Sequence, residues 1–467
     1  MFSSTVKRRR SLTRWNRAIR AGIASLLAST LVLAPIPVQA QSISFIRDAE
    51  TEKLLRDYAK PILKVAGLET QNIRVHIVKA TAFNAFVVDG QNMFINYGTL
   101  MKSKTPNQVI GVMAHETGHI AGGHLHGLRQ AAAGARSAAL MAQILGLVTI
   151  AAGAVAGGGD IGAAGAGVLY GGQSMAQRTL LSYRRGQESS ADQAAVTYLN
   201  ATKQSARGML ETFEYFQSQG LTSLQYVDPY IQSHPMPQAR ISQLRELAIS
   251  SPYFEKLDPP ELQLRHDLVR AKLSGFLDNP RIVFNRYPNS DQSLPAVYAR
   301  TIAKCRSGGA GACASDLDRL ISEHPDNPYF WELKGEFLTR WGRGGEAVAP
   351  LREAVSLEPG ESLPRIMLAQ ALLGSNDRAN ADEAITVLRQ ALVKENTHAL
   401  GYRLLSQAYG RKQLIGQADL ASAQSSLYSN DLKRAKKFAA RAKSKFRRGS
   451  PGWIKADDIL SYQPPKR

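Results

Sequence analysis

One short stretch constrains this chain more than any other: His115-Glu116-Thr117-Gly118-His119. In an α-helix, residues four apart lie on one face about one turn apart, so both imidazoles can reach a single metal ion. The glutamate between them can take a proton from a metal-bound water. A helix is favoured independently, because Ser103 or Thr105 can cap it, Pro106 suits its first turn and Gly122-Gly123 marks its end. A motif this short also occurs by chance on solvated helices, so the rest of the chain has to support the site.

A pair of acidic residues downstream offers that support. Glu188 and Asp192 are four residues apart in Gln187–Ala195, a stretch predicted to open another helix, so they share a face. Glu188 can be a third metal ligand, and Asp192 can support the ligands from behind. Two histidines and a carboxylate leave one position open for water, which is typical of catalytic zinc. The motif variant with a third histidine is excluded, because position 125 is leucine and His124 is one residue off.

The first 40 residues read as a secretory signal. Seven Lys or Arg and no acidic residue precede an apolar run from Ala21 to Leu33, and Val38-Gln39-Ala40 supplies the small-residue end. We predict export to the periplasm and cleavage after Ala40. An uncleaved membrane anchor is less favoured, because the apolar run is short for a membrane span.

Residues 41–257 are predicted to form an α+β metalloprotease domain that is mainly helical with a small sheet. A helical pattern runs from Ser42 to Leu63, and Ile73–Val78 alternates as a strand. Ala85–Val88 and Met93–Asn96 flank a turn as a hairpin. A strand beside a peptidase site can bind substrate along its edge, or it can simply pack on helices. The sequence leaves both open.

Two further stretches of this domain stand out. Residues 131–176 are rich in Gly, Ala and other apolar residues, which fits a membrane hairpin, a lid or buried helices. Glu188 has to reach the side of His115, so a bilayer could be crossed only an even number of times, and the glycines of the second half make a poor span. We therefore favour a soluble, mobile or membrane-touching segment over one that spans the membrane. Later, His234-Pro235 leads into a helix with Arg240, and both side chains can face the site.

Residues 258–467 are predicted to form an all-α solenoid of tetratricopeptide-like repeats. Glu323-His324-Pro325 and Leu357-Glu358-Pro359 start equivalent units 34 residues apart. Ala347, Ala384 and Ala435 match the small position of the second helix in three units. Such helical pairs stack into an array with a concave surface, whereas the alternative is an ordinary helical bundle.

Charge and cysteines add two open questions. Residues 411–467 hold fourteen Lys or Arg against four Asp, and a basic segment of an exported protein meets anionic lipid more often than nucleic acid. We expect no nucleic-acid partner. Cys305 and Cys313 are eight residues apart, so a local disulfide and two free thiols are both compatible with the sequence.

Together these features resemble the HtpX and CAAX-prenyl-protease family of zinc metalloproteases, in particular its exported bacterial branch with tetratricopeptide repeats. The resemblance rests on the histidine motif followed by His124, on Glu188–Asp192, on His234-Pro235 with Arg240, and on Asn84-Ala85-Phe86 as a substrate-side strand. It implies one zinc ion bound by His115, His119 and Glu188, with Glu116 as the base and Asp192 as the proton donor.

The same resemblance implies a regulated site and an envelope role. His234 would approach the zinc and restrain the resting enzyme, with Arg240 and His124 as supporting residues. Family members of this branch act in the periplasm on stalled or immature outer-membrane barrel proteins and their assembly machinery. The alternative is a chaperone or scaffold in which the repeats do the main work and the protease is largely latent.

Overall fold

The computed structural model describes residues 44–156, 159–222, 229–375 and 379–464. The predicted signal segment lies outside these residues. No helix in the described ranges is long and apolar enough to cross a membrane.

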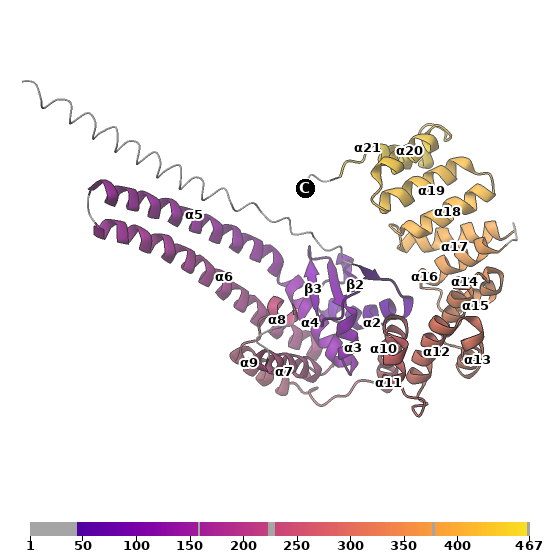
Figure 1. Cartoon of the computed structure of the whole chain (residues 1–467), viewed down its shortest axis with the longest axis horizontal. Helices are drawn as coiled ribbons and strands as arrows, with labels where there is room; N and C mark the ends of the chain where they lie inside the picture. Colours follow the sequence, from indigo (N-terminus) through magenta and orange to yellow (C-terminus); the bar gives the residue numbers. More distant parts are fainter. Residues whose placement is uncertain (1–43, 157–158, 223–228, 376–378, 465–467) are drawn as a thin grey trace, which may run out of the picture. The chain divides into compact units, whose positions relative to one another are not determined.

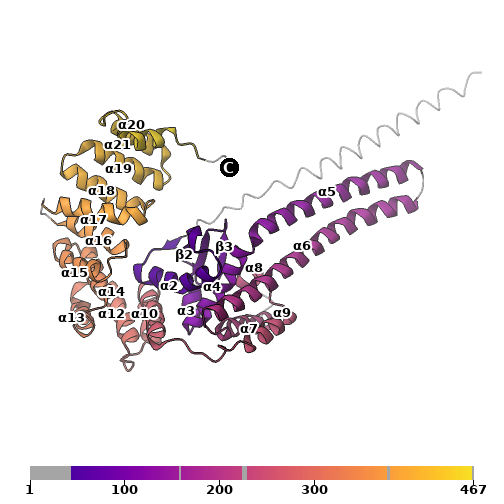
Figure 2. The same ribbon diagram turned by 180° about the vertical axis from the view of Figure 1, so that it is seen from behind.

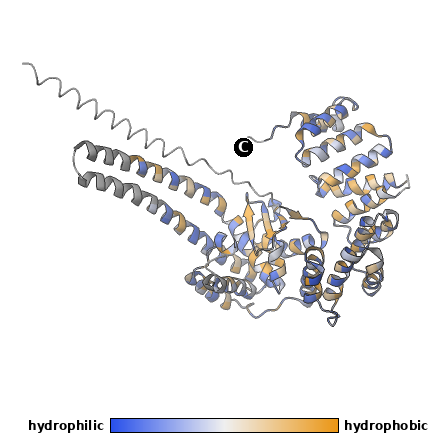
Figure 3. Cartoon of the chain, viewed as in Figure 1, coloured by the Kyte–Doolittle hydropathy of each residue, from blue (hydrophilic) through white to orange (hydrophobic). Residues whose placement is uncertain are grey.

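A four-stranded sheet forms one layer of the first domain (Figure 1). Its order is β1 (Phe45–Ile46), β2 (Arg74–Val78), β4 (Asn92–Asn96) and β3 (Ala85–Val88), with β2 parallel to β4 and the other neighbours antiparallel. The predicted strands are confirmed, and Figure 3 colours them largely as hydrophobic. Because β3 has a neighbour on one side only, its outer edge is available for pairing among the described residues.

The first helix starts later than predicted. α2 spans Ala49–Val65, and Asp48 caps it by accepting a hydrogen bond of 2.8 Å from the backbone N–H of Thr51. The prediction from Ser42 was wrong because Phe45–Ile46 forms β1, which is too short to give an alternating pattern. A 3-10 turn, η1 (Glu69–Gln71), then leads into β2.

The motif helix lies in the middle of the core. After α3 (Tyr97–Lys102), α4 runs over Pro106–Ala121, with Thr105 at its N-cap and Pro106 in its first turn, as predicted. Gly123, just beyond its end, has a φ of 60°, which glycine adopts without strain. Apolar residues of α2, the sheet and α7 (Arg207–Thr222) surround α4, so its histidines are held in a dry interior.

Two long helices follow and lie side by side (Figures 1 and 2). α5 spans His124–Ala156 and α6 spans Gly159–Ala201. The prediction that a helix opens at Gln187 was wrong: Glu188 and Asp192 lie well inside α6, because the Gly/Ala-rich run before them is itself helical. Leu140 and Met141 are 58% and 61% exposed, so these turns of α5 do not belong to a buried core. Two short helices, α8 (Pro229–Ser233) and α9 (Gln238–Ile249), complete this part.

Only helices follow in the described residues after 258. They are α10 (Pro260–Leu277), α11 (Pro280–Arg286), α12 (Leu294–Gly308), α13 (Ala310–Glu323), α14 (Pro328–Arg340), α15 (Gly344–Leu357), α16 (Leu363–Gly374), α17 (Asn380–Lys394), α18 (Ala399–Arg411), α19 (Ile415–Tyr428), α20 (Leu432–Lys443) and α21 (Pro451–Ser461). Consecutive helices pack on one another, as in a helical repeat. Ala347 and Ala384 are buried in α15 and α17, the second helices of their pairs. Ala435 is also fully buried, in α20, which packs on α19 and α21, and its place as the small residue of a second helix stays a prediction.

The two cysteines form a disulfide. Cys305 near the end of α12 is bonded to Cys313 in α13, which settles the alternative that the sequence left open. Both residues are buried. The bond therefore fixes the short connection between these helices from inside the packed layer.

A buried ammonium group joins three helices. Lys272 of α10 places its Nζ 2.6 Å from Asp48 Oδ1, 3.3 Å from Glu50 Oε2 in α2 and 3.7 Å from Glu332 Oε2 in α14. Burial raises the pKa of Glu332 to about 8 against the attraction of Lys272, so one of the three carboxyls is held as the neutral acid near neutral pH. Val269 and Leu273 of α10 pack into the same core as α4. The boundary at residue 257 thus falls in a connection, but α10 is packed on the preceding part.

His266 of α10 makes the fold sensitive to mild acid. Its ring is fully buried, with Nδ1 3.2 Å from the hydroxyl of Tyr58 and Nε2 3.1 Å from the carbonyl oxygen of Ser103. Burial lowers the pKa of His266 from 6.5 to about 4, so the unfolded chain binds its proton at a higher pH than the folded chain does. The contribution of His266 to the free energy of unfolding is therefore present above pH 6.5 and is lost as the pH falls toward 4. The loss amounts to at most about 3 kcal/mol.

We expect His266→Gln to flatten the dependence of the free energy of unfolding on pH between 6.5 and 4. Urea unfolding at a series of pH values measures this, with exposed His324→Gln as the matched control. An unchanged slope in the His266 variant would contradict the assignment.

Candidate metal centre

Two helices approach unusually closely where the site is built. A Cβ on Gly118 of α4 would lie 2.9 Å from the backbone oxygen of Ala191 in α6, so only glycine fits without a shift. The contact holds the turn of α4 that carries the histidine motif against the part of α6 that carries Glu188 and Asp192. The i, i+4 spacing on each helix then turns His115 and His119 of α4 toward Glu188 and Asp192 of α6.

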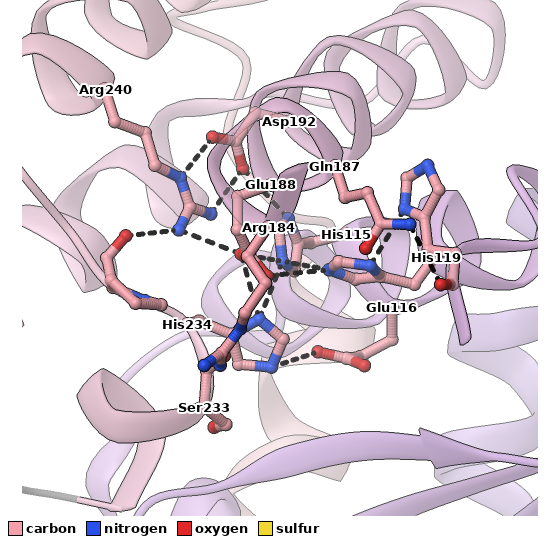
Figure 4. A network of polar contacts seen from close by, with 12 residues as sticks. His115, Glu116, His119, Arg184, Gln187, Glu188, Asp192, Ser233, His234 and Arg240 are labelled. Carbon is pink, nitrogen blue, oxygen red and sulfur yellow. Dashed lines mark hydrogen bonds and ion pairs between the residues drawn. The ribbon is translucent and has the colours of Figure 1, made fainter. Parts of the chain in front are cut away.

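Four buried side chains point toward one another in this space (Figure 4). One ligand atom from each of His115, His119, Glu188 and His234 lies within 4.8 Å of all the others. His119 Nε2 is 3.0 Å from His115 Nε2 and 3.5 Å from Glu188 Oε1, and His234 Nδ1 is 3.0 Å from Glu188 Oε2. Four atoms bound tetrahedrally at zinc distances would be separated by about 3.3–3.5 Å. The donor set and its spacing therefore fit a metal ion such as zinc.

The carboxylate of Asp192 contacts His115 from behind and does not face the cluster. Asp192 Oδ1 is 2.9 Å from His115 Nδ1, and Arg240 donates to both Asp192 oxygens, at 2.6 and 2.8 Å. Burial opposes ionisation of Asp192, but the hydrogen bonds from Arg240 outweigh it and lower the pKa of this carboxyl. A carboxylate at Nδ1 holds the proton there and leaves Nε2 free to bind a metal.

Arg240 also touches a ligand directly. Its Nη1 is 2.9 Å from Glu188 Oε2 and donates a 2.9 Å hydrogen bond to the carbonyl of Pro235, while its guanidinium lies over the ring of Phe213. The arginine is buried, and its charge is balanced by the two carboxylates of α6. It therefore connects α9, the segment after His234 and the ligand helix in one charged network.

Glu116 lies beside the cluster but makes a different contact. Its Oε1 is 3.4 Å from His234 Nε2. Burial raises the pKa of Glu116, against the attraction of His234 and His115. A carboxylate with a raised pKa binds a proton more readily than an ordinary glutamate does, which suits a proton acceptor.

His124 backs the second histidine of the motif. Its Nδ1 is 2.9 Å from His119 Nδ1, on the side of the ring away from the cluster, and the side chain of Gln187 donates to its carbonyl at 2.9 Å. Burial lowers the pKa of His119, so its imidazole is neutral and its Nε2 can serve as a ligand. His124 is itself half-buried.

The substrate-side strand meets the site at one end. The side chain of Ser233, next to His234, lies 3.5 Å from Asn84 Oδ1, and the backbone of Asn84 is fixed by two hydrogen bonds with Thr99. Ala85 is fully buried in the core, and Phe86 stacks on Phe94 of β4. Asn84 thus lies against Ser233, the residue before His234, whereas Ala85 and Phe86 belong to the edge strand β3.

Two residues of the network have no sequence signal. Arg184 of α6 donates to the carbonyl of Ser233 at 3.1 Å, and Gln187 of the same helix holds His124. Both lie one turn before Glu188 or beside it, on a helix whose start the sequence hid. Only the knowledge that α6 continues toward its N-terminus would have pointed to Arg184. Gln187 begins the predicted helical stretch, but no local pattern indicates its contact with His124.

Comparison with known proteins finds matches over the part of the chain that holds this geometry. Residues 48–248 match the model of "Peptidase family M48". The chain is 22% identical over 384 residues to the "Beta-barrel assembly-enhancing protease" of Escherichia coli (strain K12), covering 80% of this chain and 75% of that protein. It is 23% identical over 391 residues to the protein of the same name from Yersinia pestis, with the same coverage.

The ligand assignment for Glu188 can be tested by metal content. We expect purified Glu188→Ala to lose most of the bound metal, because Glu188 supplies the one charged oxygen among the four ligand atoms of the cluster. Elemental analysis after dialysis measures the stoichiometry. Glu116→Gln is the matched control, since it changes a neighbouring buried carboxylate and should keep the metal. Equal metal content in the two variants would remove Glu188 from the ligand set.

Proposed function

We propose that this chain, whose residues 48–248 belong to peptidase family M48, is a zinc endopeptidase of the periplasm that degrades outer-membrane β-barrel proteins or helps them mature. That it is a metalloprotease follows from the family together with the buried histidine and glutamate cluster. Zinc, the compartment and the substrate class are the proposed parts. The observation that carries the proposal is the cluster itself, with a buried carboxylate, Glu116, beside it.

The ligand roles follow from which atoms face inward. His115, His119 and Glu188 would hold the ion with Nε2, Nε2 and a carboxylate oxygen. A bound zinc ion would lower the pKa of water to roughly 7 and polarise a peptide carbonyl. Asp192 and Arg240 keep His115 in the required tautomer, and His124 orients His119.

Glu116 would be the residue that transfers the proton. Its carboxylate would accept the proton of the attacking water at an Oε atom and pass it to the leaving amine. Asp192 was predicted as the proton donor, but both its oxygens are engaged by Arg240 and its pKa is lowered. Its contacts support a positioning role better than proton donation.

Substrate binding would use the edge of β3. A peptide in extended form can pair with the outer edge of β3, the strand that begins with Ala85 and Phe86. Asn84 directly precedes this strand, and its own backbone is already hydrogen-bonded to Thr99. Asn84 is 3.5 Å from Ser233, so a chain bound there would pass next to the metal cluster. This arrangement suits unfolded proteins, because only an extended segment can add to a sheet edge.

The relatives and the chain's own ends support the envelope role. The matched relatives are named for assembly of β-barrels, and the first 40 residues have the pattern of a signal cleaved after Ala40. The helical repeats after residue 258 would hold clients or the outer-membrane assembly machinery on a concave surface. The basic C-terminal segment, residues 411–467, would face anionic lipid.

A second candidate function is a scaffold with a latent protease, and the position of His234 favours it. His234 approaches both Glu188 and His115, at 3.0 and 3.3 Å, and its other nitrogen reaches Glu116. It stands where a water and a substrate carbonyl would have to enter. A resting enzyme with this histidine in place would bind clients through its repeats without cleaving them.

Replacing the base separates the two functions. We expect Glu116→Gln to keep its metal and to hydrolyse an unfolded outer-membrane protein roughly 10²–10⁴ times more slowly, since general-base catalysis contributes a factor of that size. Gel-based cleavage of the client measures this, with exposed Glu211→Gln as a control that should cleave normally. Wild-type cleavage by a metal-loaded Glu116→Gln would contradict the base assignment. Intact envelope function without cleavage would favour the scaffold.

Releasing the restraint should raise activity. We expect His234→Ala to keep its metal and to cleave the same client roughly tenfold faster or more, because the competent state no longer competes with a bound imidazole. Cleavage rate and metal content are measured on one preparation. A joint loss of metal and activity would show that His234 is a permanent ligand instead.

A further inference from the structure

The hairpin of α5 and α6 exposes large apolar side chains on its outer face, where a pair of helices in water would carry polar ones. On α5, Leu140, Met141, Ile144 and Leu145 are 58%, 61%, 57% and 56% exposed. Their spacing places them on one face of the helix. The alanines at 135, 139 and 142, which are half-buried, lie on the opposite face. On α6, Met175 is 71% exposed and Leu181 is 50% exposed.

This arrangement is typical of helices in lipid. In water, large apolar residues pack between the helices and small or polar ones face outward. In a bilayer, small residues at the helix contact let the backbones approach, and large apolar residues face the acyl chains. α5 follows the second pattern, with alanine toward its neighbour and Leu, Met and Ile away from it. A binding groove for a protein client would instead collect its large apolar residues between the helices.

Two arginines mark the level at which such a hairpin would meet the lipid headgroups. Between residues 137 and 177 the sequence has a single charged residue, Asp160. Arg136 ends this stretch on α5 and Arg178 ends it on α6, each about twenty residues from the connection between the helices. They therefore lie at the same level of the hairpin. Both are exposed, and no ion pair among the described residues holds either of them.

We propose that the α5–α6 hairpin docks the enzyme on an anionic lipid bilayer, with the outward apolar face of Leu140, Met141, Ile144 and Leu145 in the lipid and Arg136 and Arg178 at the phosphate groups. Arginine at this level binds phosphate and anionic headgroups, while the apolar face supplies the insertion energy. The docking surface is separate from the basic C-terminal segment. It does not depend on peptidase activity.

The docking places the metal cluster near the bilayer. Met175 and Glu188 lie on the same helix, thirteen residues or about 20 Å apart. A polypeptide waiting at the membrane surface would thus be within reach of the edge of β3. The hairpin would supply orientation toward clients at the membrane, and the cluster would supply the chemistry.

The test is flotation of the full mature chain with vesicles of phosphatidylethanolamine and phosphatidylglycerol. We expect the wild type to float, and the variant Leu140→Gln/Met141→Gln/Ile144→Gln/Leu145→Gln to lose roughly tenfold or more in vesicle binding. Glutamine is a good helix former and the four positions are exposed, so circular dichroism and the melting temperature should not change. A matched control carries Ile249→Gln, Leu257→Gln and Val393→Gln, which are 58%, 79% and 77% exposed on other elements, and should float as the wild type does.

A second pair of measurements tests the arginines and the choice of partner. Arg136→Gln/Arg178→Gln should lose the preference for these vesicles over phosphatidylcholine vesicles. A fluorophore on Ile144→Cys should shift to shorter wavelength with vesicles, whereas one on Val393→Cys should not. The proposal is overturned if the wild type does not float, or if the quadruple variant floats as well as the wild type. It is also overturned if that variant loses affinity for an unfolded outer-membrane protein while its vesicle binding is unchanged.

Discussion

The site depends on one close contact between two helices, Gly118 of α4 against Ala191 of α6. Without it the histidines and the carboxylates would belong to different faces of the core, separated by a layer of side chains. With it, three imidazoles and a carboxylate converge in a space from which water is largely excluded. Burial on this scale is costly for charged groups unless each has a partner. Arg240 supplies the compensating charge, because it binds Asp192 through two hydrogen bonds and Glu188 through a third contact. The geometry of the ligands and the neutralisation of their environment are thus provided by the same few residues.

Much of this could be predicted from the sequence, because local patterns carry it. The cap, proline and glycine signals around His115–His119 gave α4 nearly to the residue, and the alternating stretches gave β2, β3 and β4. The i, i+4 spacings named the residues that the structure brings together, including Glu188 from a distant helix. The roles of those residues remain predictions. The match to the model of peptidase family M48 covers residues 48–248, the region that holds these motifs.

What the sequence could not provide depends on tertiary contact. The extent of α6 was missed because its first half lacks the polar face that marks a surface helix, and Arg184 was missed with it. The contact of Gln187 with the carbonyl of His124 was missed because it joins two different helices. β1 is two residues long and exists only through pairing with β2. The disulfide could not be chosen over free thiols by spacing alone. The contact of Arg240 with both oxygens of Asp192 could not be read from the sequence either, and it is this contact on which our proposal of a positioning role rests.

The buried Lys272 bears on whether this chain is modular. Its ammonium group balances the carboxylates at the start of α2 and lies 3.7 Å from Glu332 Oε2 of α14, and its neighbours Val269 and Leu273 complete the core around α4. A cut at residue 257 would leave Asp48 and Glu50 without their counter-ion and would open the apolar core to water. The peptidase part is therefore not an autonomous folding unit in the way that the boundary between sequence motifs suggests. Selection on the repeats for a new client would act on the stability of the catalytic part as well, which couples the evolution of recognition to that of chemistry.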